Sequence, residues 1–175
     1  MKNRIFETSA NPQCPLQYKI RELKDEDNEK LEKVIRSCLV EFGANHEGTV
    51  WADPELGSLS SVYQEAGTRY WIAENTGGEI LGGVGIGRLE GVDDTCELQK
   101  MYCIPQVRGT GISHKLIDTA LRYAKQYYAN CYLETLDNMI AAHKFYEKKG
   151  FKRIDQRIGN TGHVACGITY IIRLS

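Results

Sequence analysis

The 175-residue sequence contains no long apolar segment and no excess of one charge. No stretch approaches the roughly 20 apolar residues that a membrane-spanning helix requires, and residues 1–17 are polar, without the apolar core of a signal peptide. The 22 Lys and Arg residues nearly balance the 23 Asp and Glu residues, so the net charge is −1. This balance gives no support to a nucleic-acid or anionic-membrane surface. We therefore expect a cytoplasmic protein without a nucleic-acid or membrane partner.

The six cysteines and four histidines lack the spacing of a metal site. No Cys-x-x-Cys pair occurs, and the histidines are isolated from one another and from the cysteines. The even number of cysteines is compatible with disulfides, but the absence of a secretory signal favours reduced thiols. We predict that the protein binds no metal ion.

Length and periodicity indicate one α/β domain. A chain of 175 residues has room for one sizeable core, and we expect a single domain at 18–175 after a flexible segment at 1–17. Apolar runs predict strands at Tyr18–Leu23, Tyr70–Glu74, Ile80–Leu89, Cys96–Ile104, Cys131–Thr135, Phe151–Ile154 and Thr169–Leu174. Helical periodicity predicts helices that begin near Asp25 or Asp27, at Ile112, and at Asp137 or Asn138. Early hairpins and a crossover helix imply a mixed sheet covered by helices.

Two irregular stretches are expected to face the substrate. Residues Ala44–Gly67 contain only one predicted short helix, around Leu59–Glu65, and long irregular segments in compact domains are often binding loops. The second stretch, Gly159–Cys166, precedes the last strand. We interpret Trp51 and Trp71 as candidate substrate contacts.

Four glycines interrupt the strand predicted at Ile80–Leu89, at positions 82, 83, 85 and 87. Their spacing is not G-x-G-x-x-G and they do not open a helix, so they do not indicate a dinucleotide site. We predict a bent or bulged strand that other parts of the backbone approach closely.

The strongest local signal is the loop at Gln106–Ser113, between a predicted strand and an amphipathic helix. Gly109 and Gly111 permit a tight turn, and the free N–H groups at the helix start can converge on an anion with help from the helix dipole. Arg108 adds a cation at the same place. An ordinary turn is the alternative interpretation. A P-loop is excluded because no Gly-Lys-Ser/Thr follows.

Three segments together resemble the GNAT superfamily of acyl-CoA N-acyltransferases. Arg108-Gly-Thr-Gly-Ile-Ser113 resembles its Arg/Gln-x-x-Gly-x-Gly/Ala loop, with serine where Gly or Ala is usual. Residues Asn138–Phe151 resemble its Asn-helix-Tyr-x-Lys-x-Gly-Phe segment, and Glu97–Pro105 resembles the strand that leads into the loop. The resemblance implies an α+β fold with a mixed, mostly antiparallel central sheet of about seven strands flanked by helices. Homodimers are common in this superfamily.

The resemblance also implies that acetyl-CoA donates an acetyl group to a primary amine of a small molecule or peptide. Backbone groups of Met101 and Cys103 would pair with the pantetheine arm, and the Met101 amide would hold the oxyanion. The pyrophosphate would lie against Arg108, Gly109, Thr110, Gly111, Ile112 and Ser113, the last of which could add its hydroxyl. Asn138 would contact the cofactor near the pantetheine arm, cap its own helix, or do both. Cys103 has no identifiable partner that would activate its thiol, so we interpret it as structural.

Tyr146 is the candidate general acid by the same resemblance. On its predicted helix it shares one stripe with Met139 and Ala142, which faces inward. The alternative is a half-buried core tyrosine without a chemical role.

The acceptor also needs a base, because an alkylammonium has a pKa of about 10 and its free amine is the nucleophile. Period-two alternation places Glu97 and Gln99 on the strand face of Met101, so Glu97 is our candidate. A bulge in this strand would change that parity. Glu134 and an ordered water are rival bases. The alternative interpretation of Glu97 is a solvated surface carboxylate without a chemical role.

Two other functions are compatible with the sequence. The same fold could serve as a non-catalytic acyl-CoA-binding or sensing domain, or the glycine loop alone could bind phosphate or a nucleotide. Fold does not determine the acceptor. Because an acceptor amine is cationic, we expect a mildly acidic acceptor pocket.

Overall fold

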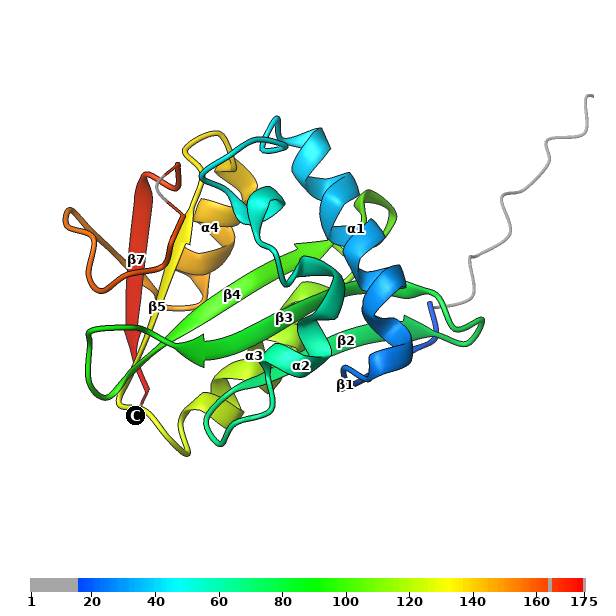
Figure 1. The fold of residues 1–175 in the computed structure, drawn as a ribbon, viewed down its shortest axis with the longest axis horizontal. Coiled ribbons are helices and arrows are strands. Elements are labelled where there is room, and N and C mark those ends of the chain that lie inside the picture. Colours follow the sequence, from blue (N-terminus) through cyan, green and yellow to red (C-terminus); the bar gives the residue numbers. More distant parts are fainter. Residues whose placement is uncertain (1–15, 164, 175) are drawn as a thin grey trace, which may run out of the picture.

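The computed structural model describes residues 16–163 and 165–174, so residues 1–15 of the segment predicted to be flexible lie outside the described part. The chain forms one seven-stranded sheet in the order β1-β2-β3-β4-β5-β7-β6 (Figure 1). Its strands are β1 (Tyr18–Glu22), β2 (Arg69–Asn75), β3 (Ile80–Arg88), β4 (Thr95–Cys103), β5 (Asn130–Thr135), β6 (Lys152–Ile154) and β7 (Ile168–Arg173). The α-helices are α1 (Asn28–Glu41), α2 (Leu59–Val62), α3 (Ile112–Ala124) and α4 (Ile140–Lys148).

Every neighbouring pair of strands is antiparallel except β4 and β5. These two strands are parallel because α3 crosses over between them, as a parallel connection requires. The predicted mixed, mostly antiparallel sheet of seven strands with flanking helices is therefore confirmed. Within the described residues, no helix is long and apolar enough to cross a membrane.

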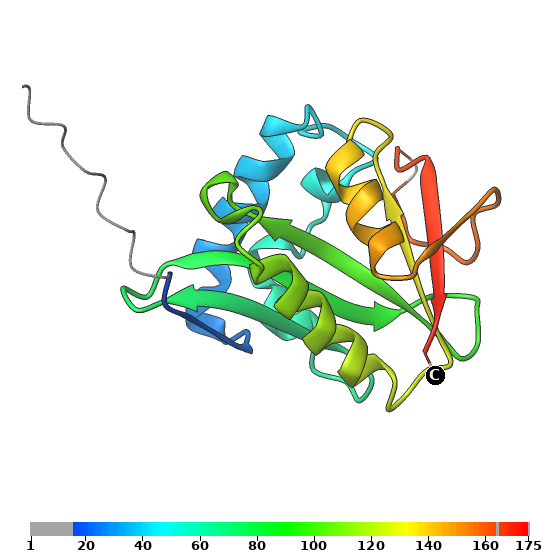
Figure 2. The ribbon, with the colours of Figure 1, turned by 180° about the vertical axis from the view of Figure 1, so that it is seen from behind.

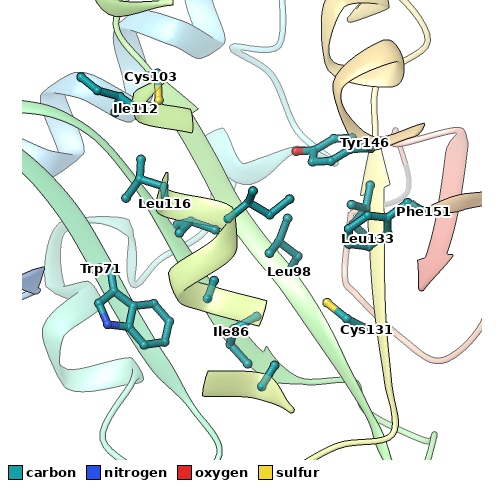
Figure 3. Close-up of a cluster of buried hydrophobic side chains, with 14 of the residues drawn as sticks. Trp71, Ile86, Leu98, Cys103, Ile112, Leu116, Cys131, Leu133, Tyr146 and Phe151 are labelled. Carbon is teal, nitrogen blue, oxygen red and sulfur yellow. The ribbon is translucent and has the colours of Figure 1, made fainter. Parts of the chain in front are cut away.

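Helices cover both faces of the sheet. The helices α1 and α2 lie on the face that is in front in Figure 1, and α3 and α4 lie on the face that is in front in Figure 2. The apolar stripe of α1 forms one core with residues of β2, through Leu31, Ile35, Leu39, Tyr70 and Ile72. The stripe of α3 forms the second core, with β3, β4 and β5 (Figure 3), through Ile112, Leu116, Ile117, Ala120 and Ala124.

The strands β4 and β5 pair only over their first residues. Thr95, Cys96 and Glu97 lie opposite 130–132 of β5, and no later residue of β4 has a partner there. Beyond this point the two ribbons diverge (Figures 1 and 2). The edge of β4 over residues 98–103 is therefore left without a strand partner on its β5 side, which leaves backbone donors and acceptors available to another extended molecule.

A β-bulge changes the direction of side chains along β4. Gly83 lies opposite Tyr102 and Gly85 lies opposite Gln99, so β4 carries one extra residue between these pairs. Lys100 within this bulge has a φ of 48°, which is rare for a residue with a side chain. Leu98 and Met101 pack on the α3 core, whereas Tyr102 packs on the α1 core. The period-two prediction that Glu97 and Gln99 share a strand face with Met101 is therefore wrong, because the bulge reverses the parity.

The glycine-rich strand β3 gives space to large side chains from neighbouring elements. A Cβ atom on Gly83 would lie 2.5 Å from the ring of Tyr70, and one on Gly85 would lie 2.8 Å from the ring and hydroxyl of Tyr63. A Cβ on Gly82 would lie 2.5 Å from the carbonyl oxygen of Tyr102. The predicted close approach of other groups to this strand is confirmed. The glycines serve packing, because they leave room for the neighbouring tyrosines.

Candidate active site

A cavity lies where β4 and β5 diverge, and it has two adjoining parts. Both parts are lined by Met101 and Tyr102 of β4 and by Met139, Ala142 and Tyr146 around α4. The part next to the glycine loop, which we call the loop side, is also lined by Cys38, Phe42, Cys103, Arg108, Gly109, Ser113, Ala141 and Phe145. The opposite part, which we call the acidic side, has among its lining residues Thr49, Val50, Glu97, Gln99, Lys100, Glu134, His163 and Cys166.

The glycine loop precedes two backbone amides at the start of α3 that have no acceptor within the described residues. Gly109 and Gly111 have φ values of 79° and 95°, and a Cβ on either would meet no atom within 4 Å. Gly111 occupies the N-cap position without a side-chain cap. Among the described residues, no acceptor bonds the amides of Ile112 and Ser113, whereas the amide of Thr110 is already bonded to Val107 O at 3.3 Å. The start of α3 therefore offers unpaired backbone donors, which a helix N-terminus can present to an anion.

Two polar side chains of this loop have protein partners. The Ser113 hydroxyl donates to the Cys103 sulfur at 3.4 Å. The Arg108 guanidinium forms a two-point ion pair with Glu41, at 2.5 and 2.7 Å, and its Nε donates to the Cys103 carbonyl at 3.0 Å. The Arg108 side chain lies over the ring of Phe42, 5.4 Å from its centroid. Arg108 thus connects the loop to the end of α1, and its charge is compensated by Glu41.

The Asn138 side chain does not cap its own helix. Its Nδ2 donates to the carbonyl of Phe42 at 3.0 Å, and α4 has Met139 at its N-cap without a side-chain hydrogen bond. The predicted cap at Asp137 or Asn138 is therefore wrong. Asn138 instead satisfies a carbonyl at the C-terminal end of α1, where helix carbonyls lack intrahelical partners.

Tyr146 lines both parts of the cavity, together with Met139 and Ala142, as the predicted helix stripe requires. Its ring is buried against Phe151, with centroids 5.8 Å apart. Its hydroxyl oxygen points away from Phe151 and Leu133 and toward β4 (Figure 3). Burial raises the pKa of this hydroxyl above its ordinary value, so Tyr146 carries its proton at neutral pH.

Glu97 is a buried carboxylate with a single hydrogen bond to the part of the chain that the structure describes. The residue is 5% exposed, and the Gln99 amide donates to its Oε2 at 2.7 Å. Burial raises the pKa of Glu97 to about 7, against the smaller lowering effects of Gln99, His163 and Lys100. Within the described part of the chain, Arg69 Nε is the only fully buried side-chain nitrogen or oxygen without a partner. The unpaired Oε1 of Glu97 therefore keeps access to solvent.

Glu134, the rival carboxylate, is fully engaged. Its Oε1 accepts from the Tyr132 hydroxyl at 2.7 Å and from Arg157 Nε at 3.0 Å, and its Oε2 accepts from Thr161 at 3.0 Å. Both of its oxygens are therefore already occupied by protein donors. Its surroundings therefore suit a structural role better than proton transfer.

The acidic side also brings together Lys100 and His163, which the sequence reasoning missed. Lys100 Nζ lies 2.6 Å from Asp53 Oδ2, and His163 Nε2 lies 2.8 Å from Asp53 Oδ1. Asp53 belongs to the predicted substrate-facing stretch 44–67, and His163 belongs to 159–166. No local pattern marked this trio, because its members are separated by 47 and 63 residues and meet only in the fold.

The two tryptophans do not line the cavity. Trp71 is buried in the α3 core and packs on Tyr123, with ring centroids 5.1 Å apart. Trp51 packs under Arg36, 4.6 Å from its ring centroid. The interpretation of Trp71 as a substrate contact is therefore wrong, because its ring is buried in the core. For Trp51, which is half-buried, a substrate contact stays a prediction. Among the described residues, no group of three or more His, Cys, Asp or Glu is placed to hold a metal ion.

Comparison with known proteins identifies this architecture. The family model of the acetyltransferase (GNAT) domain matches residues 66–153. An uncharacterized N-acetyltransferase of Escherichia coli K12, YjgM, is 40% identical over 166 residues, which cover 93% of this chain and 97% of that protein. The N-acetylaspartate synthetase of Xenopus tropicalis is 33% identical over 102 residues, 57% of this chain and 37% of that protein.

Solved structures show the same fold. A GNAT-family acetyltransferase of Staphylococcus aureus Mu50 superposes with a TM-score of 0.81 at 27% identity, over 90% of this chain and 99% of that one. The PaiA N-acetyltransferase of Thermoplasma acidophilum in complex with coenzyme A superposes with a TM-score of 0.67 at 18% identity, over 90% and 99% of the two chains.

The fold and the cavity at the diverging strands thus define an acyltransferase. The chain belongs to the GNAT acetyltransferase family, and it is an acetyltransferase enzyme.

Proposed function

We propose that this enzyme transfers an acetyl group from acetyl-CoA to a primary amine of a small molecule or peptide, by direct attack of the amine on the thioester. The observation that carries this proposal is the unpaired edge of β4 over residues 98–103, which lies between the glycine loop and Tyr146. An extended pantetheine arm can add to such an edge as a further strand does.

The donor would occupy the loop side. Amides of Gly109 and Ile112–Ser113 would bind the pyrophosphate at the start of α3, where the helix dipole favours negative charge. Backbone groups of Met101 and Cys103 would hold the pantetheine arm. The Cys103 carbonyl already accepts a bond from Arg108, so the pairing at this residue would depend on its amide. The fold likeness to a coenzyme A complex supports this placement of the donor.

The acceptor would enter from the acidic side, where Glu97 is the better base. Its pKa of about 7 leaves a large fraction ionised at neutral pH, and its Oε1 is free to take a proton directly or through a water. As the amine loses this proton, its nitrogen bonds the acetyl carbon. The Met101 amide would then stabilise the oxyanion.

Collapse of the tetrahedral intermediate breaks the carbon–sulfur bond and releases a thiolate. Tyr146 would donate its hydroxyl proton to this sulfur, and solvent in the cavity would return the proton to Tyr146. Its position on both parts of the cavity and its raised pKa suit a group that must stay protonated until the thiolate forms.

The test is thiol release from acetyl-CoA across polyamines, aminoglycosides, amino acids and peptides. We expect turnover with one class, and expect Tyr146→Phe to lower kcat by about 10²- to 10⁴-fold while the Kd for CoA stays the same. Tyr127→Phe, on an exposed ring outside the cavity, is the matched control. An absence of turnover with every acceptor would favour the acyl-CoA-sensing alternative and would overturn this proposal.

A further inference from the structure

The acidic side of the cavity carries charges of both signs at separate places. Glu97 and Glu134 line it together with Lys100 and His163. The charge of Glu134 is compensated by Arg157 at 3.0 Å. Glu97, by contrast, has only the neutral Gln99 amide as a hydrogen-bond partner among the described residues. A cationic group on the acceptor would therefore be drawn to Glu97.

Lys100 supplies a positive charge that is held rigidly at the cavity wall. The bulge gives it a φ of 48°, and its carbonyl accepts a 2.7 Å bond from the Tyr70 hydroxyl, which fixes the backbone at this strained residue. Its side chain is 11% exposed and its Nζ contacts Asp53 at 2.6 Å. An ammonium has three donor hydrogens, and Asp53 is the only partner of Lys100 Nζ within the described part of the chain. Two donors remain for a ligand.

Asp53 holds a second side chain of the cavity wall, His163, in place. Its Oδ2 contacts Lys100 Nζ at 2.6 Å, and its Oδ1 contacts His163 Nε2 at 2.8 Å. Asp53 itself does not line the cavity, whereas Lys100 and His163 do. The carboxylate of Asp53 thus contacts both groups from outside the cavity lining, and it fixes the positions of Lys100 Nζ and of the His163 ring.

We infer that Lys100 forms a carboxylate-binding subsite next to His163, and that the acceptor is an amino carboxylate whose ammonium faces Glu97 and whose carboxylate faces Lys100. This inference rests on the proposed function and specifies its substrate class. Asp53 accepts one of the three donor hydrogens of Lys100 Nζ, and the other two can bond the oxygens of one carboxylate. A diamine would instead bring a second cation against Lys100, and like charges in a confined site repel.

The experiment compares matched acceptors in the thiol-release assay. Each α- or β-amino acid in the panel is tested beside its carboxamide and its decarboxylated amine. For the preferred acceptor we expect kcat/KM at least about tenfold higher with the carboxylate than with either analogue, as a charged hydrogen bond lost from a buried site requires. In Lys100→Met this preference should fall to near unity, because only the amino acid loses a carboxylate contact. The loss of the Lys100 charge near Glu97 affects all three acceptors alike and cancels in the ratio. Lys33→Met, at an exposed lysine of α1, should keep the wild-type ratio.

The outcomes separate this inference from the proposed function. Equal turnover of acids, amides and amines by the wild-type enzyme, or a preference for diamines, would overturn the carboxylate subsite and leave the N-acetyltransferase proposal standing. An absence of turnover with every amine would overturn both. If Lys100→Met does not fold, the ratio of kcat/KM between acid and analogue in the wild-type enzyme still tests the subsite. A preference for the acid that persists in folded Lys100→Met would also contradict the assignment.

Discussion

The side-chain amide of Gln99 donates a 2.7 Å hydrogen bond to Glu97 Oε2. Gln99 is itself held by the Tyr63 hydroxyl, which donates to its side-chain carbonyl at 2.8 Å. Since Gln99 uses its carbonyl on Tyr63, its amide is directed at Glu97. The Gln99 amide therefore orients one oxygen of the proposed base and leaves the other free. Tyr63, which directly follows α2, holds Gln99 in this orientation.

This relationship predicts the pH dependence of catalysis. Glu97 acts when ionised, so log kcat/KM should fall as the pH drops below about 7, the value to which burial raises its pKa. The Gln99 bond lowers that pKa, so Gln99→Leu should move the acidic limb of the profile to higher pH. The measurement is kcat/KM from about pH 5.5 to about pH 9, a range that brackets this pKa. An unchanged limb in folded Gln99→Leu would show that another group is the base.

The buried charge of Glu97 should also cost stability. Its pKa is raised from 4.5 to about 7 in the folded protein, so the folded state is favoured below pH 4.5 and this advantage is lost as the pH rises through 7. The Glu97→Gln variant cannot ionise at this position. We expect it to unfold at higher urea concentration than the wild type at about pH 8, with a free-energy difference on the order of 3 kcal/mol, and to lose this advantage near pH 4.5. A Glu97→Gln variant that is less stable than the wild type at the higher pH would contradict the prediction.

The ion pair between Arg108 and Glu41 predicts opposite effects of two substitutions on CoA affinity. Glu41 compensates the guanidinium with both of its oxygens. Glu41→Gln should therefore free the charge for the pyrophosphate and lower the Kd for CoA several-fold, while Arg108→Gln should raise it about tenfold. Calorimetric titration with CoA measures both. A weaker affinity in both variants would mean that Arg108 serves only to hold α1 to the loop, and Glu29→Gln on the exposed part of α1 is the control.

Space at Gly85 should be needed for the geometry of the base. A Cβ there would lie 2.8 Å from Tyr63 and from the ring of Tyr70. We expect Gly85→Ala to lower the free energy of unfolding by about 1–3 kcal/mol through overpacking, and to lower kcat by displacing Tyr63 from Gln99. Gly167→Ala, where a Cβ would meet nothing within 4 Å, should change neither quantity. Urea unfolding and steady-state kinetics check the two effects, and a neutral Gly85→Ala would contradict the packing argument.

Much of the fold could be predicted because its signals are local. The stripe of Ile112, Leu116 and Ala120 predicts α3, and its burial follows from helical period alone. Gly43, predicted to end the first helix, has the left-handed φ of 67°. The bulge at Lys100 could not be placed, because it depends on how β3 and β4 pair, and one extra residue reverses every side chain beyond it.

The sequence by itself determined the glycine loop, which is the proposed donor side of the site. Gly109, Gly111 and the start of α3 are adjacent in the chain, so their backbone geometry follows from residues within one short segment. The order of strand, loop and helix then indicated the GNAT family, which the comparisons confirm.

Only the tertiary structure decided the acceptor side. It distinguished Glu97 from Glu134, because their partners Gln99 and Arg157 come from different elements, and it brought Asp53 against His163 across 110 residues. Charges are compensated by whatever lies within a few ångströms, and sequence separation says little about that distance. The lining of the proposed acceptor side therefore depends on where segments 44–67 and 159–166 pack against the diverging strands β4 and β5.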